Sequence, residues 1–469
     1  MSKEHYRKKS LGILVGGGPA PGINGVIRSV TIEAINSGLN VIGIYDGFSY
    51  LSKGDSSHTR ELRIEDVSRI HFEGGSILRT SRVNPSKSKE MLDATIKALT
   101  ELQIDYLVTI GGDDTATSSY KIESLTKGQI EVAHVPKTID NDLPLSGNMP
   151  TFGFQTARHT GVNIVQSLMM DATTTKRWYY VVTMGRSAGH LALGIGKASG
   201  ATLTIIGEEF RDRKIKFETV CDILEASIIK RMASGHPYGV AVLAEGIIHK
   251  IDTDELKNHP YVNLEKDLHG HIRLSEIDLG RIAKDEVRRR LRERGIEVTI
   301  VNKDIGYELR CADPIPFDCE YTQDLGYAAV RYLLSGNSGA IVTVDKGKLI
   351  PIKFNDIIGP NGKIKVREVD IDSDSYKVAR KYMIRIEPSD FEEIKNVARF
   401  ALIGNLKTQE FIERFKYLIN DPPVKDTEKK YQYTTTADMP HESGKEIIAE
   451  VPKKASTKKV SKPKKNNKK

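Results

Sequence analysis

The first half of the chain alternates between short apolar runs and longer stretches with helical spacing. Nearly continuous apolar, β-branched runs are typical of strands buried on both faces of a sheet. The predicted strands of this half are residues 10–17, 40–47, 105–112 and 130–137. Helical spacing covers residues 24–37, ended by Gly38, and 87–102. This alternation predicts right-handed βαβ units and a parallel sheet.

The alternation continues in the second half. The expected elements there are a helix over 156–171, strands over 178–185, 201–208 and 238–246, an arginine-rich helix over 279–294, a hairpin over 340–354, and helices near 375–385, 389–402 and 408–419. The predicted fold class is therefore α/β, with two Rossmann-like domains, mainly parallel sheets and an active site in the cleft between the domains.

The net charge of +8 is concentrated at one end of the sequence. Nine lysines and no acidic residue lie between Pro452 and Lys469, and without them 61 basic residues stand against 62 acidic ones. A basic tail of this kind does not indicate a nucleic-acid binding face. From about Pro422 few large apolar side chains remain, which predicts a disordered Lys-rich tail over 422–469.

Cys221, Cys311 and Cys319 form a sparse, odd-numbered set without a CxxC spacing. Neither a disulfide framework nor a zinc site is indicated, and a reducing compartment fits best. The N-terminal segment lacks the apolar core of a signal peptide, and no run of 18 apolar residues exists. We therefore expect a cytoplasmic protein without a membrane partner.

Three segments that follow predicted strands carry candidate chemistry. GGGPAPG (16–22) opens a helix and can cradle phosphate with backbone amides, Gly17 among them, although a tight turn explains the same pattern. IGGDDT (110–115) places Asp113 beside Asp114. Adjacent carboxylates need a cation or hydrogen bonds, so Asp113 is a Mg²⁺ candidate. A turn with solvated aspartates is the alternative.

The third segment, PKTIDND (136–142), is the most compact polar set in the chain. It holds Lys137, Thr138, Asp140 and Asp142 within six residues. In an extended backbone Thr138, Asp140 and Asp142 project to one side. One carboxylate can then accept a proton from an attacking hydroxyl while its neighbour supports the geometry or a metal.

Together these segments resemble the phosphofructokinase family. The resemblance rests on GGGPAPGINGVIR (16–28), GIYDGF (43–48), GGSILRTSR (74–82), IGGDDT, PKTIDNDLP (136–144), TFGFQTA (151–157) and MGRSAGHLAL (184–193), in order and spacing. It runs from about residue 10 to about residue 350. It implies transfer of a phosphoryl group to the 1-hydroxyl of fructose 6-phosphate, with Mg²⁺ held by Asp113.

The resemblance also implies a role for each matching residue. Asp140 would be the general base, flanked by Thr138 and Asp142. Arg82 would meet the phosphoryl donor. The residues that would contact the sugar phosphate or the transferred group are Met184, Gly185, Arg186, Glu245, Tyr307 and Arg310. Arg177 would reach the 6-phosphate bound by a neighbouring subunit, which implies a homodimer or homotetramer.

Two positions bear on the phosphoryl donor. ATP-using members commonly read GGDG and PGTIDND, whereas this chain has Asp114 and Lys137 at the variable places. A carboxylate at 114 would repel the α-phosphate of a nucleotide, and a lysine at 137 supplies charge to a short inorganic donor. The pair resembles pyrophosphate-dependent members. ATP use, a lipid or NAD kinase, a non-catalytic regulatory subunit and another sugar phosphate such as sedoheptulose 7-phosphate stay open as alternatives.

The resemblance and the composition together give the expected domains. They are a donor domain formed by 1–151 with about 308–365, a sugar-phosphate domain over 152–307, a C-terminal helical extension over 366–421, and the tail. Two departures from the family pattern are visible. Val301 stands where many members have a second cross-subunit arginine, and ELRCA (308–312) replaces a common IQRGG.

Overall fold

Most apolar runs of the first half assemble into one seven-stranded sheet of order β11-β10-β5-β4-β1-β2-β3. Its parallel strands are β1 (Ser10–Val15), β2 (Asn40–Ile44), β4 (Tyr106–Gly111), β5 (Glu131–Pro136) and β10 (Ala340–Asp345). The edge strands β3 (Thr59–Glu61) and β11 (Lys348–Lys353) are antiparallel to their neighbours. The carboxyl ends of β1, β4 and β5 therefore meet at one edge of the sheet.

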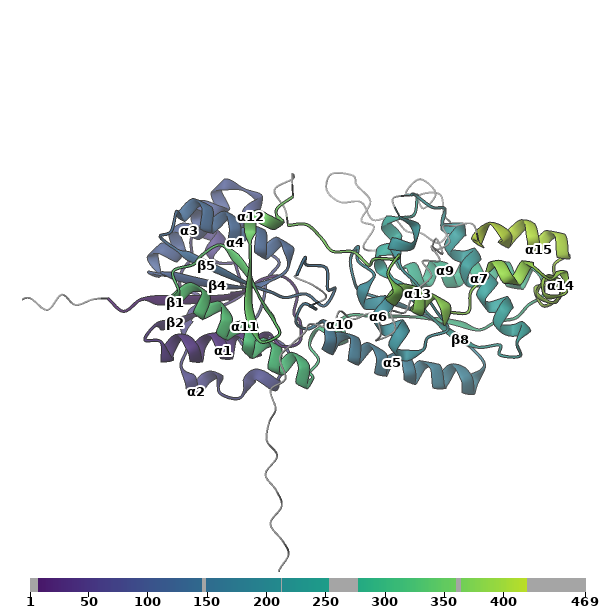
Figure 1. The fold of residues 1–469 in the computed structure, drawn as a ribbon, viewed down its shortest axis with the longest axis horizontal. Coiled ribbons are helices and arrows are strands. Elements are labelled where there is room, and N and C mark those ends of the chain that lie inside the picture. The colour runs from purple at the N-terminus through teal and green to yellow at the C-terminus, as the bar shows by residue number, and fades with distance from the viewer. Residues whose placement is uncertain (1–6, 146–148, 212, 253–276, 360–363, 420–469) are drawn as a thin grey trace, which may run out of the picture. The chain divides into compact units, whose positions relative to one another are not determined.

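Helices cover both faces of this sheet (Figure 1). α1 (Ile23–Asn36) and α11 (Pro316–Leu334) bury side chains such as Val26 and Leu325 against one face. α3 (Lys89–Glu101) and α4 (Asp113–Thr126) bury Leu99 and Ile122 against the other. A sheet covered on both faces explains why its central strands are apolar along their whole length.

A second sheet of four parallel strands has the order β7-β8-β6-β9. Its strands are β6 (Trp178–Thr183), β7 (Leu203–Ile205), β8 (Gly239–Ala244) and β9 (Ile300–Ile305). The helices around it are α5 (Phe154–Thr175), α6 (His190–Ser199), α7 (Phe217–Ala233) and α9 (Leu279–Glu293). Trp178, the only tryptophan of the chain, is fully buried in this core.

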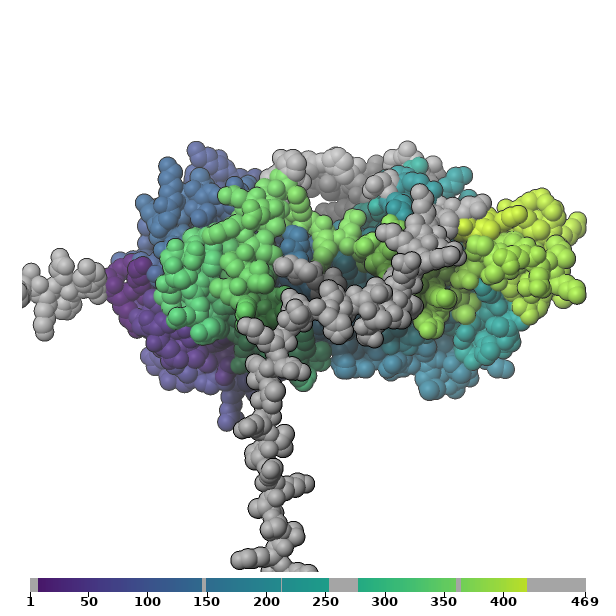
Figure 2. Space-filling view, viewed as in Figure 1, coloured from purple at the N-terminus to yellow at the C-terminus, as the bar shows by residue number. Residues whose placement is uncertain are grey.

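The remaining α-helices in the described part of the chain are short. They are α2 (Ile64–Val67), α10 (Tyr307–Arg310), α12 (Phe354–Ile357), α13 (Asp374–Lys381), α14 (Ile394–Ile403) and α15 (Thr408–Phe415). Phe400, Phe411 and Phe415 pack with Ala226 and Ile229 of α7. In the space-filling view the yellow-green C-terminal helices lie beside teal atoms of this region (Figure 2). The C-terminal extension is thus anchored on the second sheet's helices.

The computed structural model describes residues 7–145, 149–211, 213–252, 277–359 and 364–419. All of them belong to one compact unit, residues 1–425. The predicted disordered tail lies outside the described residues. The division into domains at 151/152 and 307/308 stays a prediction. Among the described residues, no helix is long and apolar enough to cross a membrane.

The mainly parallel α/β fold and the 340–354 hairpin agree with the sequence-based expectation. The predicted strand over 201–208 is wrong beyond Leu203–Ile205, because Gly207–Phe210 forms a 3₁₀ turn. The expected helix over 156–171 extends to Phe154–Thr175, and the one near 375–385 ends at Lys381. α4, α6, α7 and α11 were not predicted from the sequence.

Candidate active site

A polar cavity of about 290 Å³ lies where the carboxyl ends of strands from both sheets meet. From the first sheet come the glycine loop after β1, the start of α4 after β4, and PKTIDND after β5. From the second sheet come the segments after β6, β8 and β9. The volume is close to the roughly 300 Å³ at which small-molecule sites begin.

The glycine loop closes tightly on α4 and on PKTIDND. A Cβ at Gly16 would lie 2.3 Å from the Thr115 hydroxyl oxygen, so only glycine fits there. Gly17 has a φ of 83° and donates from its amide to the Ser81 carbonyl at 2.7 Å. The Lys137 ammonium donates to the Gly18 carbonyl. The loop is therefore fixed from both sides before any ligand arrives.

Asp113 and Asp114 form the first turn of α4, with Gly112 at its N-cap. We expected them at a strand end, and they do follow β4, but as helical residues. Acidic side chains in a first turn are favoured by the helix dipole. The Asn84 amide donates to Asp114 Oδ1 at 3.1 Å, while Asn84 Oδ1 accepts from the Ser118 hydroxyl at 3.0 Å and the Ser86 amide at 2.9 Å. Asn84 thus fixes the Asp114 carboxylate.

PKTIDND lies along the floor of the cavity. Thr138, Asp140 and Asp142 all line it, but Lys137 and Ile139 line it as well. The expected projection of alternate residues to one side is therefore not met, because the backbone turns at Asn141 and is not extended throughout. The Asp140 amide donates to the Thr138 hydroxyl at 3.0 Å. Lys137 is only 4% exposed, so its charged end is almost withdrawn from water. Asn141, between the two aspartates, has a φ of 57°.

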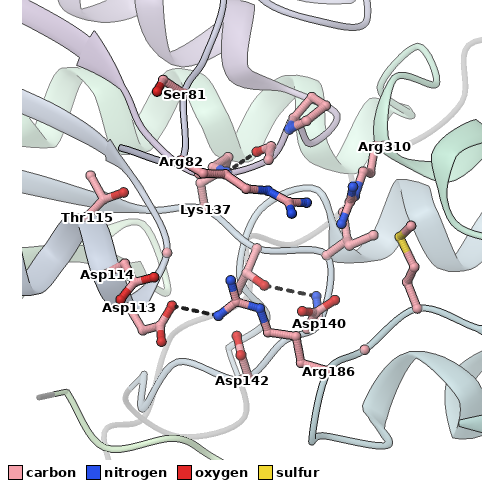
Figure 3. A pocket seen from close by; sticks show the side chains of 18 of the residues that line it. Ser81, Arg82, Asp113, Asp114, Thr115, Lys137, Asp140, Asp142, Arg186 and Arg310 are labelled. Atoms are coloured by element: carbon pink, nitrogen blue, oxygen red, sulfur yellow. Dashed lines mark hydrogen bonds and ion pairs between the residues drawn. The ribbon is translucent and has the colours of Figure 1, made fainter. Parts of the chain in front are cut away.

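The second sheet supplies the opposite wall. Met184, Gly185 and Arg186 follow β6, Glu245 follows β8, and Arg310 lies in α10 after β9. Figure 3 shows Arg186 reaching across to Asp113. The Arg186 Nη1 to Asp113 Oδ1 distance is 3.4 Å. Acidic and basic side chains that follow strands of both sheets therefore surround one small volume.

All predicted site residues line this cavity except Arg177 and Tyr307. Arg177 immediately precedes β6, so it lies at the opposite end of the strand from Met184, and its Nε is 3.8 Å from Asp171. Tyr307 is 77% exposed, with its ring centroid 5.5 Å from the Arg310 guanidinium. A single chain does not bring Arg177 to its own cavity.

Several residues that line the cavity or support its lining were not predicted from the sequence. They are Ser81, Lys87, Thr115 and, behind Asp114, Asn84. Lys87 is exposed and adds a cation to the wall that carries Arg82. The TSRVNPSK segment, 80–87, held the signal, because Asn84 before Pro85 is a typical cap of a short turn. Nothing local to the sequence links Asn84 to Asp114.

Burial changes the proton affinities of three groups in the cavity. Desolvation, and next the Asp142 charge, raises the pKa of Asp140 to about 7. Desolvation is also the largest cause that raises the pKa of Asp142, and the negative charge of Asp113 is the next largest. Desolvation, and next Arg310, lowers the pKa of Lys137 to about 7. An acid and a base with pKa values near neutrality can exchange protons in either direction of a reaction.

These pKa values predict a bell-shaped pH dependence of kcat/KM centred near neutrality. Below about pH 7 Asp140 is protonated and cannot accept a proton, and above about pH 7 Lys137 loses the charge that attracts an anion. Initial rates at low substrate concentration across the pH range measure both limbs. Lys137→Gln should keep the acid limb and lose the alkaline one. An unchanged alkaline limb would contradict the assignment to Lys137.

The carboxylates suit a hard cation such as Mg²⁺, which prefers oxygen ligands. Within the described part of the chain, however, no group of three or more His, Cys, Asp or Glu side chains could hold a metal ion by itself. This donor set fits Mg²⁺ bound through one or two carboxylates together with water and substrate phosphates. Asp113 lines the cavity and lies 3.4 Å from Arg186, and its role as a Mg²⁺ ligand stays a prediction.

The fold and the site define an α/β protein with a charged cavity at the carboxyl edge of parallel strands, where such folds bind phosphorylated ligands. Residues 10–333 match the family profile described as phosphofructokinase. The chain belongs to the phosphofructokinase family, and the resemblance seen in its motifs is confirmed.

Individual proteins of this family are similar to the chain over most of its length. The chain is 56% identical over 409 residues to a pyrophosphate–fructose 6-phosphate 1-phosphotransferase of Thermotoga maritima, covering 86% of this chain and 97% of that protein. It is 51% identical over 418 residues to the enzyme of the same name from Naegleria fowleri, covering 87% and 96%. The fold is similar to a solved pyrophosphate-dependent phosphofructokinase from Nitrosospira multiformis, with a TM-score of 0.61 at 16% identity, covering 80% and 90%.

Proposed function

We propose that this chain transfers a phosphoryl group from pyrophosphate to the 1-hydroxyl of fructose 6-phosphate, giving fructose 1,6-bisphosphate and phosphate. The observation that carries the proposal is the presence of Asp114 and Lys137 in the same cavity as Asp140. The two relatives that are more than half identical carry this activity in their names. The reaction is reversible and belongs to sugar-phosphate breakdown and synthesis.

Asp140 is the general base of the proposed reaction. The sugar 1-hydroxyl oxygen attacks the terminal phosphorus of pyrophosphate, the bond to the bridging oxygen breaks, and phosphate leaves. The hydroxyl proton passes to the Asp140 carboxylate. The pKa of about 7 supports this role, because the group can return the proton when the reaction runs backward.

Lys137, Arg82 and Arg186 neutralise the charge of the donor and of the group in transfer. Phosphoryl transfer depends mainly on positioning and on charge stabilisation, which fixed cations in a small cavity supply. The Lys137 ammonium, held at the Gly18 carbonyl beside Gly17, is placed against the glycine loop that would cradle pyrophosphate. Mg²⁺ held by Asp113 would add positive charge to the donor phosphates.

The sugar phosphate occupies the wall built by the second sheet. Glu245 accepts hydrogen bonds from sugar hydroxyls, and Met184 and Gly185 contact the sugar. Arg310 grips the 6-phosphate, with Tyr307 beside it. Thr138 and Asp142 support Asp140 from the same segment. The family match supports these roles, and so does the place of each of these residues except Tyr307 in the cavity lining.

Arg177 completes the site of a neighbouring subunit in this proposal, so the enzyme is a homodimer or homotetramer. Its position away from its own cavity supports that reading. Arg177→Ala should raise KM for fructose 6-phosphate about tenfold, the loss expected for one charged contact. A mixed oligomer of Arg177→Ala and Asp140→Asn subunits should regain some sites with normal KM. Steady-state kinetics before and after subunit mixing test this, and no recovery would refute cross-subunit action.

The experiment that tests the function is fructose 1,6-bisphosphate formation from fructose 6-phosphate and Mg²⁺, with pyrophosphate and ATP compared in parallel. Turnover with pyrophosphate, and formation of pyrophosphate in the reverse direction, are expected. Turnover with ATP alone would overturn the donor assignment while keeping Asp140 as the base. Inactivity with both donors would favour a regulatory subunit or another sugar phosphate such as sedoheptulose 7-phosphate. A cytoplasmic location stays a prediction.

A further inference from the structure

A segment beyond the family match connects the two halves of the site. The family profile ends at residue 333, and residues 364–371 lie after α12, on the way to α13. In Figure 1 this green stretch runs from the elements of the first sheet toward those of the second. We call residues 364–371 the strap. Two of its residues, Arg367 and Val369, make specific contacts with segments that carry site residues.

Arg367 forms hydrogen bonds with the backbone of the PKTIDND segment. Its guanidinium donates to the Asn141 carbonyl at 3.1 and 3.2 Å, to Asn141 Oδ1 at 2.5 Å, and to the Met149 carbonyl at 3.3 Å. Its backbone amide donates to the Asp142 carbonyl at 2.6 Å. Asn141 Oδ1 also accepts from the Thr151 amide at 3.0 Å. One side chain thus joins Asn141 to Met149, two points in the stretch between β5 and α5.

The Arg367 hydrogen bonds stabilise PKTIDND at its strained residue. Asn141 lies between Asp140 and Asp142 in the left-handed region, with a φ of 57°. Such a conformation costs free energy for a residue other than glycine, and surrounding contacts must hold it. The direction in which Asp140 points depends on this turn. Arg367 itself does not line the cavity, so it acts on the site only through its neighbours.

The other end of the strap is attached to the second sheet. The Val369 amide donates to Glu208 Oε1 at 3.0 Å, and the same oxygen accepts from the Gly189 amide at 2.7 Å. Gly189 is the N-cap of α6 and stands three residues after Arg186. Glu208 is buried, so these two bonds are shielded from water. The strap therefore links the loop that carries Arg186 to the loop that carries Asp140.

We propose that Arg367 is a positioning residue that fixes the Asp140 carboxylate relative to the Arg186 side of the site. The expected effect on kcat rests on the proposed function, whereas the expected effect on backbone structure does not. A planar guanidinium can donate to several acceptors in a fixed geometry, which an ammonium cannot reproduce. A shift of about 1 Å at a reacting group can cost about a hundredfold in rate.

Arg367→Gln tests the proposal. It should lower kcat about tenfold to a hundredfold and leave both KM values within about threefold, because substrate contacts are retained. Arg367→Lys should fall between this variant and the wild type. The control is Arg294→Gln, which removes another half-buried arginine away from the cavity. Arg294 bonds the backbone carbonyls of Arg290 and Gly404 and also the buried carboxylate of Glu225, so its loss should cost at least as much stability. The control should lower Tm and leave kcat unchanged.

Hydrogen exchange gives a reading that does not depend on activity. In Arg367→Gln the amides of residues 138–143 should exchange faster, while those of β4 and β8 keep their wild-type rates. Unchanged exchange in 138–143 together with unchanged kcat would overturn the proposal. Faster exchange throughout both sheets would also overturn it, because Arg367 would then be a general stabilising residue. An inactive wild-type protein would refute the proposed function and leave the exchange test intact.

Discussion

Replacement of Asp140 by asparagine is expected to lower kcat with pyrophosphate about a thousandfold, within the range for loss of a general base. The amide keeps the size of the side chain but cannot accept the proton of the sugar hydroxyl. KM for fructose 6-phosphate should change little. The acid limb of the pH profile, which we assign to Asp140, should disappear. Steady-state rates and the residual pH profile measure both effects.

Stability distinguishes lost chemistry from lost structure. Burial and the Asp142 charge raise the pKa of Asp140 to about 7, so its ionisation costs folding free energy that grows from about pH 4, its usual pKa, to about pH 7 and stays constant above. A neutral asparagine removes this penalty, and Tm should stay equal or rise. Asp304→Asn, an exposed aspartate of β9 that does not line the cavity, is the control and should remain active. Retained activity in Asp140→Asn would refute the assignment of the base.

Joint replacement of Asp114 and Lys137 by glycine should raise the ratio of ATP to pyrophosphate use by about two orders of magnitude, the size of effect seen when one charge-stabilising group is lost. Removing the Asp114 carboxylate opens space and removes repulsion at the α-phosphate position. Removing Lys137 takes a nearly buried cation away from the short donor. Most of the change should come from the loss of pyrophosphate activity.

The single variants separate the two causes. Asp114→Gly alone should admit ATP and leave pyrophosphate use largely intact, since Lys137 remains. Asn84→Ala should have a weaker effect of the same kind, because the Asp114 carboxylate loses the amide that orients it at 3.1 Å. Thermal unfolding must accompany these assays, since Lys137→Gly empties a packed position under the glycine loop. A donor ratio unchanged in the double variant would refute the steric and electrostatic argument.

Much of the fold is readable from the sequence because both sheets are covered by helices. Strands buried on two faces are apolar throughout. β1, β4, β6 and β8 can therefore be recognised in the sequence as continuous apolar runs. α4 was missed because its first two turns, DDTATSS, carry no apolar stripe. Its signal was a pair of acidic residues at the N-terminus, which we interpreted only as chemistry.

The site was predictable as far as its residues follow strands. Asp113, Lys137 and Arg186 each follow a parallel strand, and topology alone brings such positions to one edge. Arg367 lies 226 residues from its partner Asn141 and 225 from Asp142 by sequence number, in a segment without periodicity. No local pattern marks such a contact. Asn84 was missed for the same reason, although it lies only 30 residues from Asp114.

The single tryptophan gives the second sheet its own spectroscopic label. Trp178, in β6 of the second sheet, is fully buried among apolar side chains, and the first sheet contains no tryptophan. Its fluorescence emission should therefore be blue-shifted in the folded protein and report only on the core around β6. Far-ultraviolet circular dichroism reports on both sheets. If the two transitions separate in denaturant, the sheets unfold in steps, and if they coincide, the chain behaves as one cooperative unit.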